Sequence, residues 1–141
     1  MSRRLLFVVA MVTALTLITA GSALAEGSWS SYISGWVTGH SSRNWDKNVN
    51  DGVHTTIKLT GCHQSNHPET PRSPDLELWH VYSLWPDSSV AVRHYGSCYS
   101  AAQTNDFTYP NTGTYHFTLK KIDGLEGFGM ILDVNSVVVN Y

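Results

Sequence analysis

The amino-acid sequence predicts an all-β domain, a single β-sandwich of six to seven antiparallel strands closed by one disulfide. Three observations predict this class. Apolar and polar residues alternate through most of the chain after Ser30, which is the pattern of half-buried strands. Clusters of Gly, Pro, Asn and Asp separate the alternating runs, and no run has helical spacing. Two cysteines, Cys62 and Cys98, follow the expected leader, so only one disulfide pairing exists.

Residues 1–25 have the composition of a signal peptide. Two arginines precede an apolar run at 5–20, and the "ALA" at 23–25 has the small-residue spacing of a cleavage site. A membrane-spanning helix needs about 20 apolar residues, which is more than this run supplies. We therefore expect a secreted, extracellular chain made of one domain, residues 26–141, without membrane insertion.

The charge of the expected mature chain excludes one class of partner. Loss of the leader removes two of nine basic residues and none of eleven acidic ones, which leaves a net charge of −4. Nucleic-acid binding requires a basic stripe, so we expect no nucleic acid as partner. In an exported chain, Cys62 and Cys98 are expected to form a disulfide worth roughly 3–4 kcal/mol.

The first two expected strands are 31–38 and 53–60. In the first, strict alternation directs the side chains of Trp36 and Ile33 to opposite faces of the strand. We expect Trp36 to lie in the core. In the second, "VHTTIKLT" alternates cleanly, so one set of side chains faces one side of the strand and the remaining side chains face the other. That set comprises Val53, Thr55, Ile57 and Leu59.

The next two strands, 76–84 and 89–95, form an expected hairpin with Pro86 and Asp87 at the centre of a type I turn. This turn would place Val81 opposite Val92 and Trp79 opposite His94. Trp79 is expected to be a core residue.

The last strands lie at 114–122 and 130–141. The first would direct Tyr115 and Phe117 inward together with Leu119, and the second changes phase at Asn135-Ser136, which predicts a bulge. The stretches 62–74 and 99–113 show no alternation and are expected to be irregular loops.

The segment "YPNTGTYHFTL" at 109–119 resembles the corner and following strand of immunoglobulin-like and PKD-like β-sandwiches. In both, a glycine precedes a tyrosine by two positions and an alternating strand follows. The resemblance implies an immunoglobulin-like architecture in which Tyr115 is the corner tyrosine. Its hydroxyl would bond to backbone just upstream.

Four oxygen-bearing side chains precede a glycine near residue 50, as in a calcium loop. They are Asp46, Asn48, Asn50 and Asp51. The EF-hand pattern fails, because the glycine comes one position late and the twelfth position is apolar. A looser oxygen cage is the alternative to a simple turn, and we favour the turn. We expect no metal and no cofactor.

Seven histidines offer a second metal hypothesis. His63 and His67 are four apart, but the surrounding prolines exclude the helix that would bring them together. His80 and His94 are expected on adjacent strands of the hairpin. A zinc site is the alternative, and solvent-facing strand histidines are the favoured interpretation.

The aromatic content suggests binding. Five Trp and seven Tyr exceed what a small core requires, and four of them lie in or beside expected loops. Exposed rings suit stacking on sugars or contact with a protein partner, and the alternative is that they cover the ends of the sandwich. The candidate binding residues are Trp45, Trp85, Tyr99 and Tyr109.

We therefore predict a secreted, non-catalytic binding module for an extracellular glycan or a secreted or cell-surface protein. It could be a subunit or adaptor of a secreted complex, with "EGSWSS" at 26–31 as an extended arm. Because no nucleophile motif is present, no catalytic residue is assigned. The alternative is a small secreted hydrolase that uses histidines and carboxylates, since a carboxylate pair can be matched in space without a sequence motif.

Overall fold

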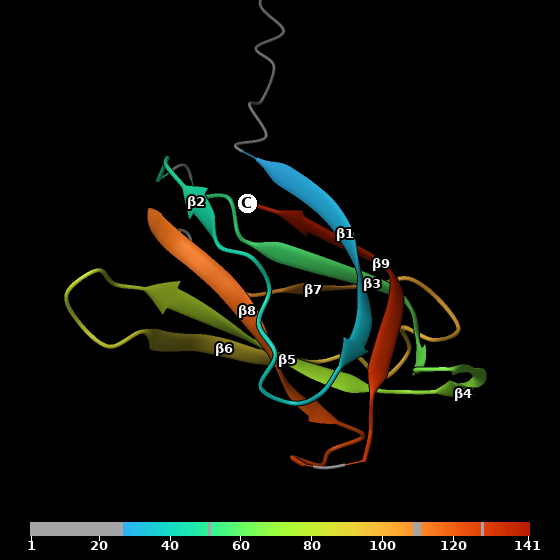
Figure 1. The fold of residues 1–141 in the computed structure, drawn as a ribbon. Helices are drawn as coiled ribbons and strands as arrows, with labels where there is room; N and C mark the ends of the chain where they lie inside the picture. The colour runs from blue at the N-terminus through green and yellow to red at the C-terminus, as the bar shows by residue number, and fades with distance from the viewer. Residues whose placement is uncertain (1–26, 51, 109–110, 128) are drawn as a thin grey trace, which may run out of the picture.

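The structure is a computed structural model that describes residues 27–50, 52–108, 111–127 and 129–141. Its strands form two antiparallel sheets (Figure 1). One sheet has the order β1-β9-β3-β4, with β7 also paired to β3, and the other has the order β2-β8-β5-β6. The strands are β1 (Ser28–Trp36), β2 (Trp45–Lys47), β3 (Thr56–Gln64), β4 (His67–Pro71), β5 (Pro74–Val81), β6 (Ser88–His94), β7 (Gln103–Asp106), β8 (Gly113–Ile122) and β9 (Leu132–Asn140).

One hydrophobic core joins the inner faces of the two sheets. Ile57 and Leu59 of β3 are fully buried, and so are Tyr115, Phe117 and Leu119 of β8, as their alternation predicts. The β-sandwich class is therefore confirmed. Immunoglobulin-like membership is not established by this fold alone.

The described residues form nine strands, where the sequence predicts six to seven. The additional strands are the short β2, β4 and β7, which lie in stretches expected to be loops. Each lies at a sheet edge and pairs with one neighbour. They are only three to five residues long and mostly polar, so the sequence pattern does not reveal them. The prolines of β4 are tolerated there, because an edge strand does not need every backbone N–H.

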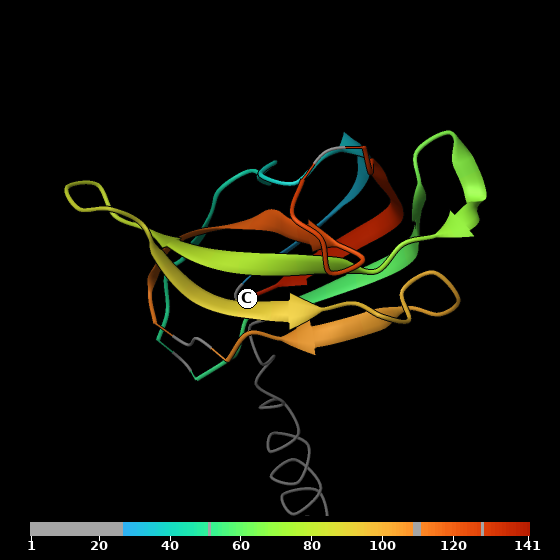
Figure 2. The ribbon, with the colours of Figure 1, turned by 90° about the horizontal axis from the view of Figure 1, so that it is seen from below.

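The predicted turn between β5 and β6 is wrong. β5 ends at Val81 and β6 begins at Ser88, so a six-residue loop replaces the two-residue turn. Glu77, not Val81, lies opposite Val92. The Asp87 carboxylate accepts a hydrogen bond from the Tyr82 backbone N–H at 3.2 Å and so closes the loop instead of forming a turn centre. The loop projects well beyond the sheets (Figure 2).

The predicted bulge in the last strand is confirmed. Ser31 and Ile33 of β1 are two residues apart and pair with Val137 and Val134 of β9, which are three apart. The expected N-terminal arm is wrong, however. Residues 28–31 belong to β1 and pair with β9 along their length, because the backbone groups of a sheet edge offer them partners.

The disulfide is confirmed. The sulfurs of Cys62, in β3, and Cys98, in the β6–β7 connection, are 2.04 Å apart, and both residues are fully buried. The corner tyrosine is also confirmed, since the Tyr115 hydroxyl donates a hydrogen bond to the Asn111 carbonyl at 2.9 Å.

The expected leader lies outside the described residues. Within the described part of the chain, no helix is long and apolar enough to cross a membrane.

Candidate binding site

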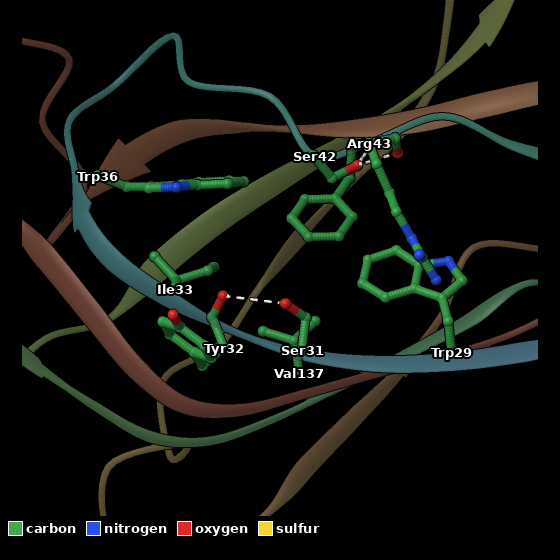
Figure 3. Close-up of a pocket in the computed structure, with 9 residues that line it drawn as sticks. Trp29, Ser31, Tyr32, Ile33, Trp36, Ser42, Arg43 and Val137 are labelled. Carbon is green, nitrogen blue, oxygen red and sulfur yellow. Dashed lines mark hydrogen bonds between the residues drawn. The ribbon is translucent and has the colours of Figure 1, made fainter.

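A narrow cavity of about 140 Å³ opens at one side of the sandwich, between β1 and the connection that precedes β2. We call it the aromatic slot. Figure 3 shows two tryptophans of β1 at its ends, with the side chains of the strand between them. The slot is lined by Trp29, Ser31, Tyr32, Ile33, Trp36, Ser42, Arg43, Phe117 and Val137.

A bulge in β1 places both tryptophans on the slot. Trp29 and Trp36 are seven residues apart, and an unbroken strand would direct them to opposite faces. The register against β9 shifts between Ile33 and Trp36, around Gly35, whose φ of +68° favours glycine. Strict alternation is therefore wrong here, and Trp36 lines the slot together with Ile33.

Trp29 and Trp36 both contact Phe117 of the opposite sheet. The Trp29 ring lies nearly parallel to Phe117 at a centroid distance of 6.2 Å, and the Trp36 ring is tilted at 5.9 Å. His40 approaches the Trp36 ring edge-to-face at 6.0 Å. Both tryptophans are half-buried and pack against the core, so each ring holds a fixed position at the margin of the core.

Arg43 is the charged group of the slot. Its guanidinium carbon lies 4.5 Å from the centroid of the Trp29 ring, a cation–π geometry. Among the described residues, no carboxylate is within ion-pair distance of Arg43 and none of its guanidinium N–H groups donates a hydrogen bond. The guanidinium therefore has its hydrogen-bonding capacity available at the slot.

Ser42 fixes the second wall of the slot. Its hydroxyl donates to the Arg43 carbonyl at 2.9 Å and accepts from the Phe117 backbone N–H at 3.0 Å. The backbone N–H of Ser42 also bonds to the Phe117 carbonyl at 2.8 Å. These bonds attach the connection to β8, and the Arg43 side chain extends from it over the Trp29 ring at one end of the slot (Figure 3).

The aromatic residues that the sequence proposes as a site do not come together. Trp85 is 75% exposed in the β5–β6 loop, and Tyr99 is 41% exposed in the β6–β7 connection. These two segments lie at opposite ends of β6, and the Tyr99 hydroxyl donates to the Glu69 carbonyl at 3.4 Å. Tyr109 lies outside the described residues.

The prediction that Trp45 is an exposed binding residue is wrong. The side chain is only 5% exposed, because β2 lies against β8 and turns the ring into the core. There it contacts Trp29, Tyr115, Phe117 and Tyr141 at centroid distances of 5.8 to 6.4 Å. Trp79, expected in the core, lies half-buried on the outer face and stacks on His116.

Three of the four candidate calcium ligands lie within the described residues. Asp46 lies in β2, not in a turn, and accepts a hydrogen bond from the Thr114 hydroxyl at 2.6 Å. Asn48 and Asn50 are exposed, and Asp51 lies outside the described residues. Among the residues that the structure places, no group of three His, Cys, Asp or Glu side chains could hold a metal ion.

The histidines occupy separate places. His80 and His94 lie on adjacent strands as expected but at opposite ends, opposite Ser88 and Asp75. His80 faces the core, and burial lowers its pKa. The negative charge of Asp87 raises this pKa, but by less than burial lowers it. His94 bonds to the Asp75 carboxylate at 2.6 Å.

A larger, open hollow beside β8 does not present a catalytic pair of carboxylates. This open hollow holds Glu77 and Glu126, but Glu77 accepts hydrogen bonds from Ser89 at 2.5 Å and Lys120 at 3.1 Å. Glu126 is largely exposed and faces Lys121 at 3.6 Å. Each of these carboxylates thus already has a lysine partner.

Comparison with known proteins gives a distant structural likeness. No family model and no curated protein match the sequence. Among solved structures, the chain is similar to the CBM32 of AlyQ in complex with 4,5-unsaturated mannuronic acid, over 85% of this chain and 81% of that chain, with 12% identity and a TM-score of 0.40. A likeness at this identity and TM-score does not establish a family.

The sequence gives little sign of the slot. Trp29 lies in a polar segment, and Arg43 lies 14 residues further along the chain. Only the pairing of β1 with one sheet and of the connection with the other brings them together. The one available signal is the glycine at position 35, since an isolated glycine inside an alternating run suggests a bulge.

Proposed function

We propose that this protein is a secreted, non-catalytic module that binds an extracellular glycan in the aromatic slot. The observation that carries the proposal is the pairing of half-buried rings with an available guanidinium in one small cavity. Sugars present C–H faces that pack on aromatic rings and hydroxyls that accept hydrogen bonds. A rigid ring beside a donor group suits both features.

The slot has the chemistry of binding without bond cleavage. No carboxylate and no histidine belong to its described lining, so it lacks the side chains that most often act as general acid or general base. The histidine–carboxylate pairs of the chain, such as His54 with Asp106, lie elsewhere. In the described residues, no serine hydroxyl donates a hydrogen bond to a histidine, which the hydrolase alternative would require for an activated serine.

Two features support export. The sequence begins with a predicted signal peptide, and the domain contains a disulfide, which persists in oxidising compartments outside the cytoplasm. An extracellular position would give the slot access to glycans of cell walls, matrices or secreted polymers.

The experiment is a binding screen of the mature protein on immobilised oligosaccharides, followed by calorimetry with the best ligand. Trp36→Ala and Tyr32→Ala should each weaken binding, the first by about 30-fold, which corresponds to about 2 kcal/mol at a hot-spot ring. Tyr32 is 70% exposed, so its variant should fold even if Trp36→Ala is destabilised.

Trp85→Ala is the matched control, because it removes the same side chain from an exposed site outside the slot. The proposal fails if no oligosaccharide binds. It also fails if Tyr32→Ala and a folded Trp36→Ala bind as tightly as the wild type.

A second candidate function is contact with a protein partner through the β5–β6 loop. Leu84 and Trp85 are neighbours at its tip and are 88% and 75% exposed, which suits an anchor inserted into a partner pocket. Affinity capture from culture medium with wild-type protein and with a Leu84→Ser, Trp85→Ala double variant tests it. A secreted protein retained by the first and not by the second would support this function.

A further inference from the structure

We propose that the aromatic slot selects sugars that carry an anionic substituent, a carboxylate or a sulfate, and that Arg43 is the residue that determines this preference. The inference rests on the proposed glycan-binding function and names the chemical class of its ligand.

The charge of the slot is the first argument. Arg43 alone is charged among its described lining residues, although the chain as a whole has more acidic than basic residues. Asp46 and Asp133 accept hydrogen bonds from the Thr114 hydroxyl and the Gly35 backbone N–H, each at 2.6 Å, and neither carboxylate belongs to the described lining of the slot. A local positive charge on an acidic protein attracts an anionic ligand more strongly than a neutral ligand of the same shape.

The geometry of Arg43 is the second argument. Its guanidinium is held on the Trp29 ring at 4.5 Å, and this ring is itself fixed by Phe117 and by Trp45. Stacking uses the face of the guanidinium and leaves the in-plane N–H groups available. These N–H groups match the two oxygens of a carboxylate or sulfate, and holding them in place reduces the entropy lost on binding.

The slot offers further contacts to such a sugar. The Trp36 ring stands at the other end of the cavity, with the exposed Tyr32 ring and the Ser31 hydroxyl on the strand between them (Figure 3). A ring packed on Trp36 would therefore place a substituent toward Arg43. The cavity of about 140 Å³ is smaller than a typical ligand site, which favours one sugar unit over a long chain enclosed on all sides.

Arg43 has an alternative role as a cover for Trp29, since long basic side chains shield apolar surface. The two roles differ in their ligand dependence. A covering arginine affects stability and every ligand alike, whereas a binding arginine affects only anionic ligands.

The experiment compares charged sugars with neutral partners of the same ring. The probes are galacturonate, glucuronate and mannuronate oligosaccharides with their methyl esters, and sulfated galactan oligosaccharides with their desulfated forms. Calorimetry on the mature protein should show at least about tenfold tighter binding of a charged probe, as expected for a charge-assisted hydrogen bond. This advantage should decrease with added salt.

Three variants locate the preference. Arg43→Gln should abolish the advantage of the charged probe and leave the affinity for its neutral partner within about twofold, while Arg43→Lys should retain part of the advantage. Arg93→Gln is the matched control, because Arg93 also lies over an aromatic ring, Phe107 at 5.7 Å, but outside the slot. It should bind like the wild type.

The outcomes separate this inference from the proposed function. The anionic preference is overturned if a charged probe and its neutral partner bind equally well, or if the screen finds only neutral glycans that bind. Either result leaves the proposed glycan binding intact. A preference that survives in Arg43→Gln overturns the role of Arg43. Absence of binding to every probe and to the whole screen rejects the proposed function itself. The uronate and sulfate arms show which anion is preferred.

Discussion

Trp45 and Trp85 look alike in the sequence and have opposite environments in the structure. Each lies in a stretch of polar and turn-forming residues, yet Trp45 is 5% exposed and Trp85 is 75% exposed. β2 pairs with β8 and directs Trp45 into the core, whereas the β5–β6 loop extends beyond both sheets. The difference shows that the pairing of the flanking strands, and not a polar neighbourhood, decides whether an aromatic ring is packed or exposed.

The same comparison extends to the two candidate surfaces. In the aromatic slot, the Trp29 and Trp36 rings pack against Phe117 at the margin of the core. At the tip of the β5–β6 loop, the side chains of Leu84 and Trp85 are mostly exposed. A pre-positioned ring loses little entropy on binding, and a mobile one loses more. The slot is therefore the stronger candidate for a small ligand.

The largest expected effect is that of Trp45→Ala. This change removes ring contacts with Trp29, Tyr115, Phe117 and Tyr141 and leaves a cavity between the sheets. We predict a loss of about 3–5 kcal/mol of unfolding free energy, measured by urea denaturation. A loss below about 1 kcal/mol would mean that the ring is not packed as described.

Loss of the disulfide should have the next largest effect. The bond closes a separation of 36 residues between β3 and the β6–β7 connection, at the end of β6 away from Trp85. The Cys62→Ala, Cys98→Ala double variant should lose about 3–4 kcal/mol in the chain-entropy model. Equal stability of this variant and the wild type would show that strand pairing alone fixes these segments.

The strand cores were predictable from the sequence, and the site was not. Alternation identified Ile57, Leu59 and Phe117 because each lies in a strand that is regular over many residues. The slot depends on an interruption of that regularity at Gly35 and on pairing between distant segments. A period-two pattern contains neither, so Trp29 and Arg43 carry no local signal.

The corner tyrosine was predictable for a different reason. The donor Tyr115 and the acceptor carbonyl of Asn111 are four residues apart, so the motif is complete within one short segment. The hairpin register failed because Asp87 bonds to Tyr82 across the whole loop, a closure that a two-residue turn does not anticipate.

The stability of the fold should depend moderately on pH, because of histidines at the base of the β5–β6 hairpin. Burial lowers the pKa of His80, which stacks on Tyr115 at 4.8 Å and lies 4.3 Å from Tyr82, and the pKa of His116 is lowered for the same reason. Below pH 6.5, the usual pKa of histidine, these two side chains bind protons more readily in the unfolded chain than in the folded chain. Stability should therefore be complete above this pH and decrease as the pH falls through it.

Denaturation at about pH 7.5 and about pH 5.5 measures this dependence. His80→Gln should reduce it, whereas His67→Gln, which changes a side chain that is 65% exposed, should not. An identical pH dependence in His80→Gln and the wild type would assign the effect to other groups.

The smallest effect is expected from Trp85→Ala. The ring is 75% exposed and lies beside Leu84, which is 88% exposed, so its removal leaves no cavity. We predict a change in unfolding free energy below about 0.5 kcal/mol, as for other surface positions, and an unchanged affinity for any glycan bound in the slot. Urea denaturation and calorimetry on the same protein measure both quantities. A large loss of stability would show that the loop folds back onto the sheets in solution. A loss of glycan affinity with normal stability would move the binding site from the aromatic slot to the loop tip.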